Sequence, residues 1–514
     1  MGIVSLPDWS HKQLHIGDIF TPPQWAEFAI EKFDIFQKWI NGALVFDPTM
    51  GTANLLEALI IYGIKQGYAI NELPTHCLFG NELNTHHFVK AQQKFEQRYQ
   101  LFMHSNFTNE DLLHLPPKQY DIILGNPPWQ NFVDLPDNYK QKIKHYFFKY
   151  DLVDNSRNLL LGGSRIDLAA LIVQVAIKDF LAENGEAVFF LPLSLFLNDG
   201  ANKSFRTYSI AEIKYALQCI YDFNDTAIFG GVATRYGLAH FIRNQHTTFP
   251  IPYFCLNEGV WANKVAQPMF HQTDPLSVMA EQDTVMFDSI TPIVIDKESC
   301  PRQGINTCGA NDIFIFDTLI SVDEHTVSVS NKILTDVLLP RQFVFPLIAA
   351  KNFGFHPLVP NKWVLLPYDS NGKALEWQQI QVFTDLQNYL ETHKIKLQNR
   401  KGVLLNATMK RGYWWALLGV GAYSFFPYKV VWEAYGRKSF KPQIFDGHWQ
   451  ANQSLQAFIP VKTLAEAQRI CTALSDKKVE DYLLSLKMEG TMNWAQPGKI
   501  KKLVVYGDEA LNLF

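Results

Sequence analysis

The sequence predicts an α/β protein whose first half forms a doubly wound, mostly parallel β-sheet. Short aliphatic runs alternate with longer segments of helical period, and a polar or glycine-containing turn follows several of these runs. The chain has 514 residues, too many for one ordinary hydrophobic core, so two or three domains are expected. Hydrophobic residues at 47% and charged residues at 19% are typical of a folded globular protein.

The predicted elements follow one another in alternating strand and helix order. Strands are expected at 43–47, 76–82, 120–125 and 186–192, and helices at 54–66, 85–100 and 167–183. Two further strand candidates, 215–223 and 236–244, could close the sheet in the antiparallel direction. In such folds ligands bind outside the carboxyl ends of the strands, so the residues that follow the strands form the candidate site.

The domain pattern changes after residue 245. The stretch from about 245 to 300 is polar and proline-rich, and the second half has short strand-like runs and many Trp, Tyr, Pro and Gly residues. We therefore predict a site-bearing domain at 1–260, a connection at 261–300 and a mixed α+β domain at 301–514.

The bulk composition excludes several classes of protein. The six cysteines are scattered without a CxxC pair, as expected for reduced thiols in a cytosol, and no metal-ligand spacing is convincing. Apolar stretches such as 187–197 are too short to span a bilayer, and the first residues carry no signal-peptide pattern. The formal net charge of −4 means that any nucleic-acid site must be a local basic patch. A soluble, cytoplasmic protein is expected.

The segment FDPTMGTANLL, residues 46–56, predicts a ligand-binding turn. A strand ends in Asp47, the turn contains Gly51, and a helix starts near Asn54, so free backbone amides suit an anionic or polar ligand. Glu82 ends the next strand, and its carboxylate can accept from both hydroxyls of a ribose. Together the two features favour a cofactor that carries a nucleoside. The alternative for Glu82 is a surface acid that caps the following helix.

Two more segments belong to the candidate site. In NFTNEDL, Phe107 could cover an adenine face and Asn106 could read its amino group, or Phe107 could simply belong to the core. In YDIILGNPPW, residues 120–129, a buried strand must end at Asn126 because proline has no N–H to continue a ladder. What remains is a rigid turn with unpaired carbonyls and a tryptophan.

These motifs resemble the adenine-specific DNA methyltransferases of restriction–modification systems, in the order of the gamma class. The resemblance rests on five segments in that order, namely 17–30, 46–59, 79–83, 106–113 and 120–129, with weaker similarity at 302–314 and 425–442. It implies a Rossmann-like methyltransferase domain followed by a DNA target-recognition domain. It also implies S-adenosyl-L-methionine as cofactor and site-specific methyl transfer to the N6 of a flipped-out adenine in double-stranded DNA.

The resemblance assigns roles to individual residues. The catalytic residues would be Asn126, Pro127, Pro128 and Trp129. The cofactor-binding residues would be Thr21, Pro22, Asp47, Pro48, Thr49, Gly51, Glu82, Asn106, Phe107 and Asn126. Trp129 would stack on the target base, with Phe196 or Phe205 as a second aromatic against it. For Thr21 and Pro22 a helix start is an additional reading, with Thr21 as cap and Pro22 at the first position.

The sequence departs from the family pattern at two positions. Ala53 stands where the family usually has a second glycine, so we expect that the turn does not need a positive φ there. Asn106 stands where the family often has Asp, and its side-chain carbonyl can still accept one hydrogen bond.

The region from Lys394 to Lys441 predicts a DNA-binding surface. It holds ten Lys and Arg residues and one acid, Glu433, and it is interleaved with aromatic residues. Phosphate contacts are expected from Lys401, Lys410, Arg411 and Lys438. The alternative is a solvated basic face over an ordinary aromatic core.

Three other functions fit less of the sequence. They are a methyltransferase for protein glutamine or RNA, a binding protein that keeps the fold without catalysis, and a fused restriction–modification enzyme. The cofactor-contacting segment begins near residue 14 and no nuclease motif is convincing, so a separate cognate restriction endonuclease would be the partner. A monomer without membrane contact is expected.

Overall fold

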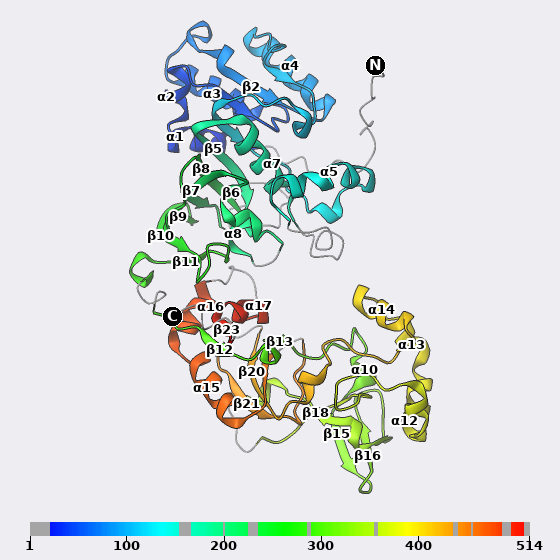
Figure 1. Cartoon of the computed structure of the whole chain (residues 1–514). Helices are drawn as coiled ribbons and strands as arrows, with labels where there is room; N and C mark the ends of the chain where they lie inside the picture. Colours follow the sequence, from blue (N-terminus) through cyan, green and yellow to red (C-terminus); the bar gives the residue numbers. More distant parts are fainter. Residues whose placement is uncertain are drawn as a thin grey trace. The chain divides into compact units, whose positions relative to one another are not determined.

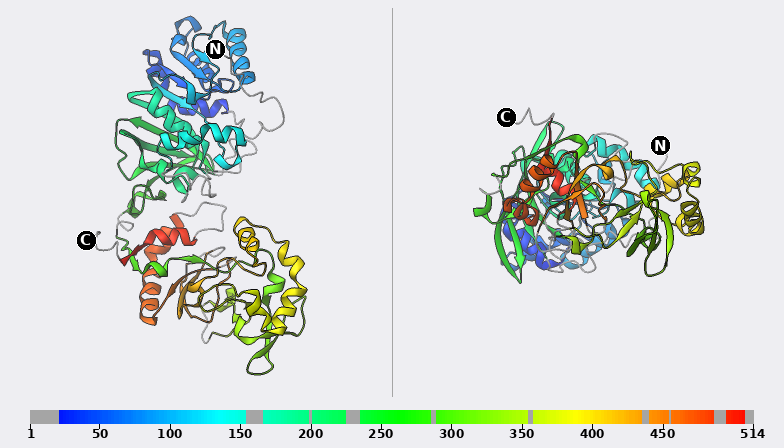
Figure 2. Two further views of the ribbon diagram at one scale, coloured as in Figure 1. Left: turned by 45° about the vertical axis from the view of Figure 1, so that its right-hand side comes forward. Right: turned by 90° about the horizontal axis from the view of Figure 1, so that it is seen from below.

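The computed structural model divides the chain into two compact units, Met1–Val285 and Met286–Phe514 (Figures 1 and 2). The structure describes residues 21–153, 166–198, 201–224, 235–284, 289–353, 358–434, 440–453, 456–485 and 495–507. The division after residue 285 falls within the predicted connection at 261–300. Within the described ranges, no helix has the length and apolar character needed to cross a membrane.

The first unit is built on one large sheet. In its described part the strand order is β11-β10-β9-β7-β8-β5-β4-β1-β2-β3, with β6 (Ser209–Ile210) paired to β7. The strands from β3 to β5 run parallel, which confirms the expected doubly wound α/β fold. Their bounds are β1 Val45–Asp47, β2 Leu78–Asn81, β3 Phe107–Thr108, β4 Tyr120–Gly125 and β5 Leu181–Pro192.

The other half of this sheet is mixed. β8 (Tyr236–Arg243) runs antiparallel between β5 and β7 (Ile213–Asp222), as the sequence suggested. β9 (Ile251–Asn257), β10 (Val260–Gln267) and β11 (Ser277–Met279) then extend the sheet. The predicted connection therefore starts too early: β10 and β11 lie at the edge of the sheet, and β10 buries only Ala266.

Helices cover both faces of the sheet because its central strands are apolar on both sides. Along β4, Ile123 faces one core, whereas Ile122 and Leu124 face the other. One core includes the apolar helix α7 and also α5, and the second includes α1 to α4. The helices are α1 Pro23–Lys32, α2 Ile35–Ile40, α3 Asn54–Lys65, α4 Thr85–Tyr99, α5 Asp137–Lys149, α7 Leu168–Val175 and α8 Ser194–Leu197.

The second unit has four small sheets in its described part. They pair β12 (Ile293–Ile295) with β23 (Val504–Tyr506), and join β13 (Arg302–Gln303), β22 (Gln456–Val461), β20 (Tyr428–Glu433) and β21 (Gln443–Asp446). They also join β14 (Ile315–Phe316), β19 (Trp363–Leu365) and β18 (Val344–Pro346), and β15 (Thr318–Ser321), β16 (Thr326–Ser330) and β17 (Val337–Pro340). The helices are α10 Asn311–Phe314, α11 Trp377–Gln381, α12 Thr384–Thr392, α13 Lys394–Gln398, α14 Val403–Lys410, α15 Leu464–Leu474, α16 Lys477–Ser485 and α17 Pro497–Ile500.

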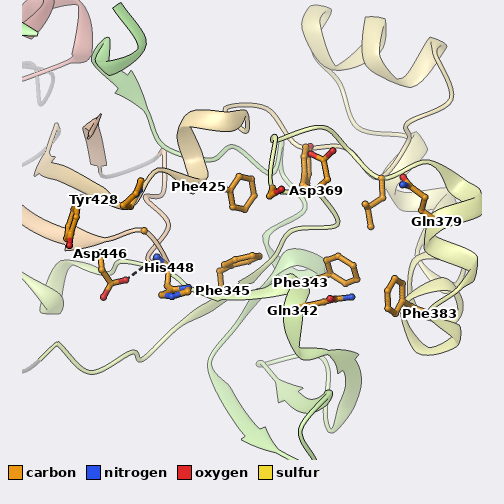
Figure 3. Close-up of a pocket in the computed structure, with 15 residues that line it drawn as sticks. Gln342, Phe343, Phe345, Asp369, Gln379, Phe383, Phe425, Tyr428, Asp446 and His448 are labelled. Carbon is orange, nitrogen blue, oxygen red and sulfur yellow. Dashed lines mark hydrogen bonds between the residues drawn. The ribbon is translucent and has the colours of Figure 1, made fainter. Parts of the chain in front are cut away.

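A pocket of about 750 Å³ lies in this unit (Figure 3). Four phenylalanine rings line it, together with the carboxylates of Asp369 and Asp446. Each of these acids accepts backbone N–H groups of its own turn, for example Asp446 from His448 at 3.0 Å. The lining contains no Lys or Arg, so this pocket does not suit a phosphate.

Candidate active site

The turn after β1 is held against the end of β2. The Asp47 side chain is buried and accepts from Thr49 N at 3.1 Å. Burial raises the pKa of Asp47 well above its usual value, against the lowering effect of the Thr49 bond, and the nearby charge of Glu82 raises it further. Met50 N donates to Asn81 O at 2.8 Å, which ties the turn to the neighbouring strand.

Glu82 meets this turn directly. Its Oε2 accepts from Gly51 N at 2.8 Å, and its Oε1 accepts from Asn84 N at 2.7 Å. The structure thus brings together Gly51 and Glu82, two residues that the sequence placed in the cofactor site. Glu82 does not cap α4 itself: Asn84 is the cap, accepting from His86 N, and Glu82 holds the backbone of that cap.

Asn81 is a site residue that the sequence analysis missed. It is buried, its Nδ2 donates to Pro48 O at 3.3 Å and to Glu110 O at 3.1 Å, and its Oδ1 accepts from Thr108 Oγ1 at 2.9 Å. One side chain therefore connects the turns that follow β1 and β3. An amide at the end of a buried strand was the available signal.

Ala53 overturns an expectation. Its φ is +59°, in the left-handed region, where it precedes the first residue of α3. The turn therefore does need a positive φ at this position, as it does at Gly51, whose φ is +54°. An L-residue in this conformation costs about 1–2 kcal/mol, so the backbone here is strained.

Replacing Ala53 by glycine is expected to change the stability of the first unit by less than about 0.5 kcal/mol, although Ala53 is fully buried. Glycine removes the left-handed strain of about 1–2 kcal/mol, which offsets both its extra freedom in the unfolded chain and the loss of a buried methyl group worth about 0.8 kcal/mol. Urea denaturation would measure the change. Ala58→Gly, within α3, is the control and should destabilise by about 1 kcal/mol or more. A loss for Ala53→Gly as large as that for Ala58→Gly would contradict the strain.

Asn126 joins three segments that are distant in sequence. It follows the last residue of β4, and its Nδ2 donates to Thr21 Oγ1 at 3.2 Å. Its backbone oxygen accepts from Thr49 Oγ1 at 3.4 Å. Thr21 does not cap a helix: α1 begins at Pro23 with Pro22 before it, so the predicted helix start was one residue early. The buried Thr21 instead faces the NPPW turn.

Trp129 is positioned by a hydrogen bond from its ring nitrogen and by a neighbouring aromatic ring. Its Nε1 donates to Phe190 O at 3.2 Å, and its ring lies 5.3 Å from that of Tyr236, tilted by 31°. Sequence analysis missed Tyr236, because its position depends on β8 pairing with β5, where Tyr236 lies opposite Pro192. The half-buried Trp129 thus already has one aromatic neighbour.

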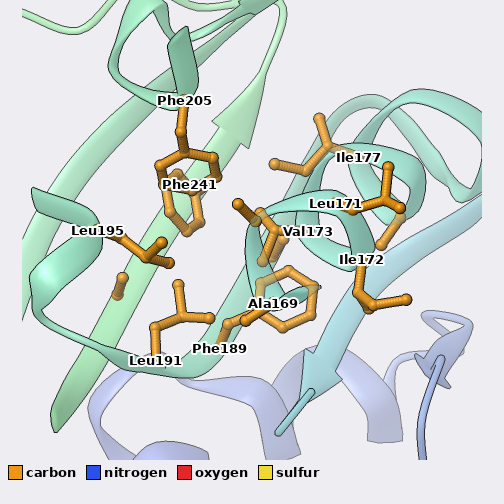
Figure 4. Packing of buried hydrophobic residues seen from close by; sticks show 14 of the residues in the cluster. Ala169, Leu171, Ile172, Val173, Ile177, Phe189, Leu191, Leu195, Phe205 and Phe241 are labelled. Carbon is orange, nitrogen blue, oxygen red and sulfur yellow. The ribbon is translucent and has the colours of Figure 1, made fainter. Parts of the chain in front are cut away.

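Phe196 and Phe205 are not placed to sandwich a base. Both side chains are fully buried, and their rings lie 5.8 Å apart. Figure 4 shows Phe205 beside Phe241 in the packed core, near Leu195. Phe196 lies in the short helix α8 and Phe205 in the turn Ser204–Thr207, and because both are buried, neither ring presents a face to a ligand.

Asn106 and Phe107 also lie elsewhere than predicted. The Asn106 Nδ2 donates to Leu78 O at 2.8 Å and to His76 O at 2.9 Å, which places it toward the amino end of β2. Phe107 is buried against Phe95 at 5.1 Å, so the core reading was correct. The carboxyl end of β3 comes at Thr108, two residues later than Asn106.

Asp167 anchors the segment after NPPW. It is buried at the start of α7, accepts from Ala169 N at 3.0 Å and also accepts from the backbone of Gln130. Leu168 N donates to Gln130 O at 2.7 Å, so the segment after the NPPW turn is bonded to the start of α7. Burial raises the pKa of Asp167 to about 7, and the two backbone bonds only partly oppose this.

Asp167 should make the stability of the first unit depend on pH. Its carboxyl binds a proton more tightly in the folded chain than in the unfolded one, where the pKa is 3.8. Stability is then highest below pH 4 and falls as the pH rises through about 7, by at most roughly 4 kcal/mol. Asp167→Asn should remove this slope, as unfolding at pH 5 and pH 8 would reveal. An unchanged slope would contradict the assignment.

The basic region is less uniform than its sequence. Arg400 is buried and donates to the carbonyls of Thr307, Trp414 and Ala416 at 2.8–3.1 Å. Lys429 is also buried; it donates to Gly447 O, and burial lowers its pKa to about 7. These two cations hold the fold and cannot contact DNA.

The residues predicted to contact phosphates, and the neighbouring Lys396, differ in their surroundings. Lys401, Lys410 and Arg411 are exposed, as expected for phosphate contacts. Lys396 is paired with Asp312. Lys438 lies outside the described residues. The adjacent Trp414 and Trp415 are buried in the core of the unit, so for these two rings the alternative reading of an ordinary aromatic core is correct.

One known protein family matches part of this chain. The family described as "Eco57I restriction-modification methylase" matches residues 61–229. The matched stretch contains Glu82, the NPPW turn and Asp167. A search of curated proteins finds no match.

The solved structures that match this chain have low sequence identity to it. The type IIL restriction-modification enzyme MmeI in complex with DNA is 13% identical over 85% of this chain and 60% of its own, with a TM-score of 0.49. A nuclease-deletion mutant of the type ISP restriction-modification enzyme LlaGI, in complex with a DNA substrate mimic, is 12% identical over 94% of this chain and 54% of its own, with a TM-score of 0.48. A putative class I S-adenosylmethionine-dependent methyltransferase from Listeria monocytogenes is 13% identical over 48% of this chain and 68% of its own, with a TM-score of 0.33. The chain thus spans 60% and 54% of the first two proteins.

Proposed function

We propose that this protein is a DNA methyltransferase that moves the methyl group of S-adenosyl-L-methionine to the N6 amine of adenine, in a restriction–modification system. The observation that carries the proposal is the position of Asn126. It sits at the carboxyl end of β4, bonded to Thr21 and Thr49, next to the Asp47–Gly51 turn. The match to a restriction–modification methylase family over residues 61–229 supports the same reaction.

The residues after β1 and β2 suit the cofactor. A positive φ at Gly51 and Ala53 lets the backbone turn tightly, so a ligand can approach the turn closely. Glu82 lies at this turn with a carboxylate that can accept from ribose hydroxyls, and Asp47 is the nearest buried acid. We assign these residues, with Pro48, Thr49, Thr21 and Pro22, to cofactor binding. When bound, the cofactor supplies an activated methyl group on a sulfonium.

Asn126 and Pro127 would activate the acceptor amine. The bond from Asn126 Nδ2 to Thr21 orients the amide so that Oδ1 is the acceptor for one N–H of the amine. The Pro127 carbonyl would accept from the other N–H. Both acceptors localise the nitrogen lone pair, which forms the new N–C bond as the C–S bond breaks, and the amine then releases one proton. The prolines hold the acceptors in place before the reaction.

The target adenine must leave the duplex to reach this turn, which costs a few kcal/mol of pairing and stacking. Stacking on Trp129 returns about 1–3 kcal/mol. Tyr236 lies beside Trp129, whereas Phe196 and Phe205 are buried in the core. We assign it to holding the Trp129 ring at its angle, and the second unit to DNA recognition.

Tritium transfer from labelled S-adenosyl-L-methionine tests the function. Unmethylated duplex DNA, RNA and a protein mixture would be offered in parallel, and the labelled base would be identified after hydrolysis. Label recovered as N6-methyladenine in DNA is the expected result. Label in RNA or protein, or as another base, would overturn the proposal. If the label is recovered as N6-methyladenine in DNA, a separate endonuclease would be sought by its cleavage of the unmethylated sites only.

A further inference from the structure

A small hollow in the second unit is lined by amides. It measures about 340 Å³ and is formed by Asn306, Thr307, Gly309, Asn311, Asn452 and Gln453, with Ile305. None of these residues carries a charge. We call this hollow the amide pocket.

Internal hydrogen bonds orient two of its amides. The Asn306 Oδ1 accepts from Cys308 N at 2.7 Å, and the Asn311 Oδ1 accepts from Thr307 Oγ1. Because each bond uses one lone pair of an amide oxygen, both NH₂ groups remain as donors for a ligand, and each oxygen keeps a second lone pair. The loop is shaped by positive φ at Cys308 and Gly309.

A cationic segment adjoins the amide pocket. Arg400 Nη1 donates to Thr307 O at 3.1 Å, and Lys396 pairs with Asp312 beside Asn311. The segment from 394 to 413 contains no Asp or Glu. Its exposed cations include Lys401, Lys410 and Arg411.

We propose that the amide pocket receives the hydrogen-bonding edge of a nucleobase while the cationic segment 394–413 contacts the flanking phosphates. This rests on the proposed function and deepens it. Amides both donate and accept, which matches base edges, whereas phosphates require cations. The two chemistries are linked through one buried residue: Arg400 donates to Thr307 O in the pocket wall, and the exposed Lys401 follows it in the chain. The acid-lined pocket of Figure 3 lacks the cations.

Selection of bound duplexes from a random library tests this inference without any methyl donor. The full chain is compared with Asn311→Ala and Gln453→Ala, which line the pocket, and with Gln381→Ala, an exposed amide elsewhere in the unit. Each pocket variant should bind the preferred duplex about tenfold more weakly and relax the preference at one position. Binding to a random duplex should stay unchanged, as should all binding by Gln381→Ala.

Lys410→Ala and Arg411→Ala provide the complementary measurement. They should weaken binding to every duplex alike and lower the salt dependence of the affinity by about one contact each. Pocket variants that bind the preferred duplex as tightly as the wild type, with unchanged thermal unfolding, would overturn the inference. So would weakening on all duplexes alike, or selection of RNA over DNA. Absent methyl transfer with this binding pattern intact would count against the proposed function alone.

Discussion

Replacing Asn126 by alanine should lower the rate of methyl transfer to DNA by roughly 10²–10³-fold. The variant removes one preorganised acceptor for the amine, and loss of a comparable group in an oxyanion hole costs about 3–4 kcal/mol. Single-turnover transfer of tritium would measure the rate, and calorimetry would measure binding of S-adenosyl-L-methionine. The rate should fall far more than the cofactor affinity, because Asp47, Gly51 and Glu82 remain.

Two further variants separate this role from a structural one. Asn138→Ala changes an exposed asparagine on α5 and should keep the wild-type rate. Thr21→Val removes the partner of Asn126 Nδ2 but leaves Oδ1, so it should slow transfer less than Asn126→Ala. An Asn126→Ala protein that is folded and transfers methyl groups at the wild-type rate would refute the assignment.

Replacing Asp222 by alanine should lower the free energy of unfolding of the first unit by about 3–5 kcal/mol. Asp222 is fully buried at the end of β7, where it pairs with Arg235 and accepts from Tyr253 OH and from Asn224 N at 2.8 Å. Removing the carboxylate leaves the mostly buried Arg235 guanidinium without its counter-charge. Urea denaturation followed by tryptophan fluorescence would measure the loss.

The control for Asp222 is an exposed ion pair in the same unit. Asp137 pairs with Lys140 on α5 with its side chain 90% exposed, so Asp137→Ala should leave the stability almost unchanged. Equal changes in the free energy of unfolding for the two variants would show that the buried ion pair stabilises the unit no more than the exposed one. Arg235 precedes Tyr236, so Asp222→Ala should also disturb the ring beside Trp129.

The local sequence pattern was sufficient to predict a residue's position wherever that position depends only on the residue's own strand. The four parallel strands, the antiparallel β8 and the positions of Asp47, Glu82 and Asn126 at strand ends all follow from alternation of apolar runs with turns. The same pattern failed at Asn106, because a two-residue strand such as β3 has no period to read. It also failed at 251–279, where edge strands resemble a polar connection.

Pairing across the sheet decided the rest. Tyr236 lies beside Trp129 because β8 inserts next to β5, and Thr21 meets Asn126 although 105 residues separate them. Packing likewise decided that Phe196 and Phe205 belong to the core, and that Arg400 and Lys429 hold the fold rather than DNA.

The sequence by itself determined the α/β class, the NPPW turn and the residue types of the candidate site, because period, proline chemistry and strand ends are local properties. The tertiary structure alone decided which side chains meet, which cations are exposed and which backbone positions are strained. Ala53 illustrates the difference: its left-handed φ comes from the tie between the turn and β2, and no local preference of alanine predicts it.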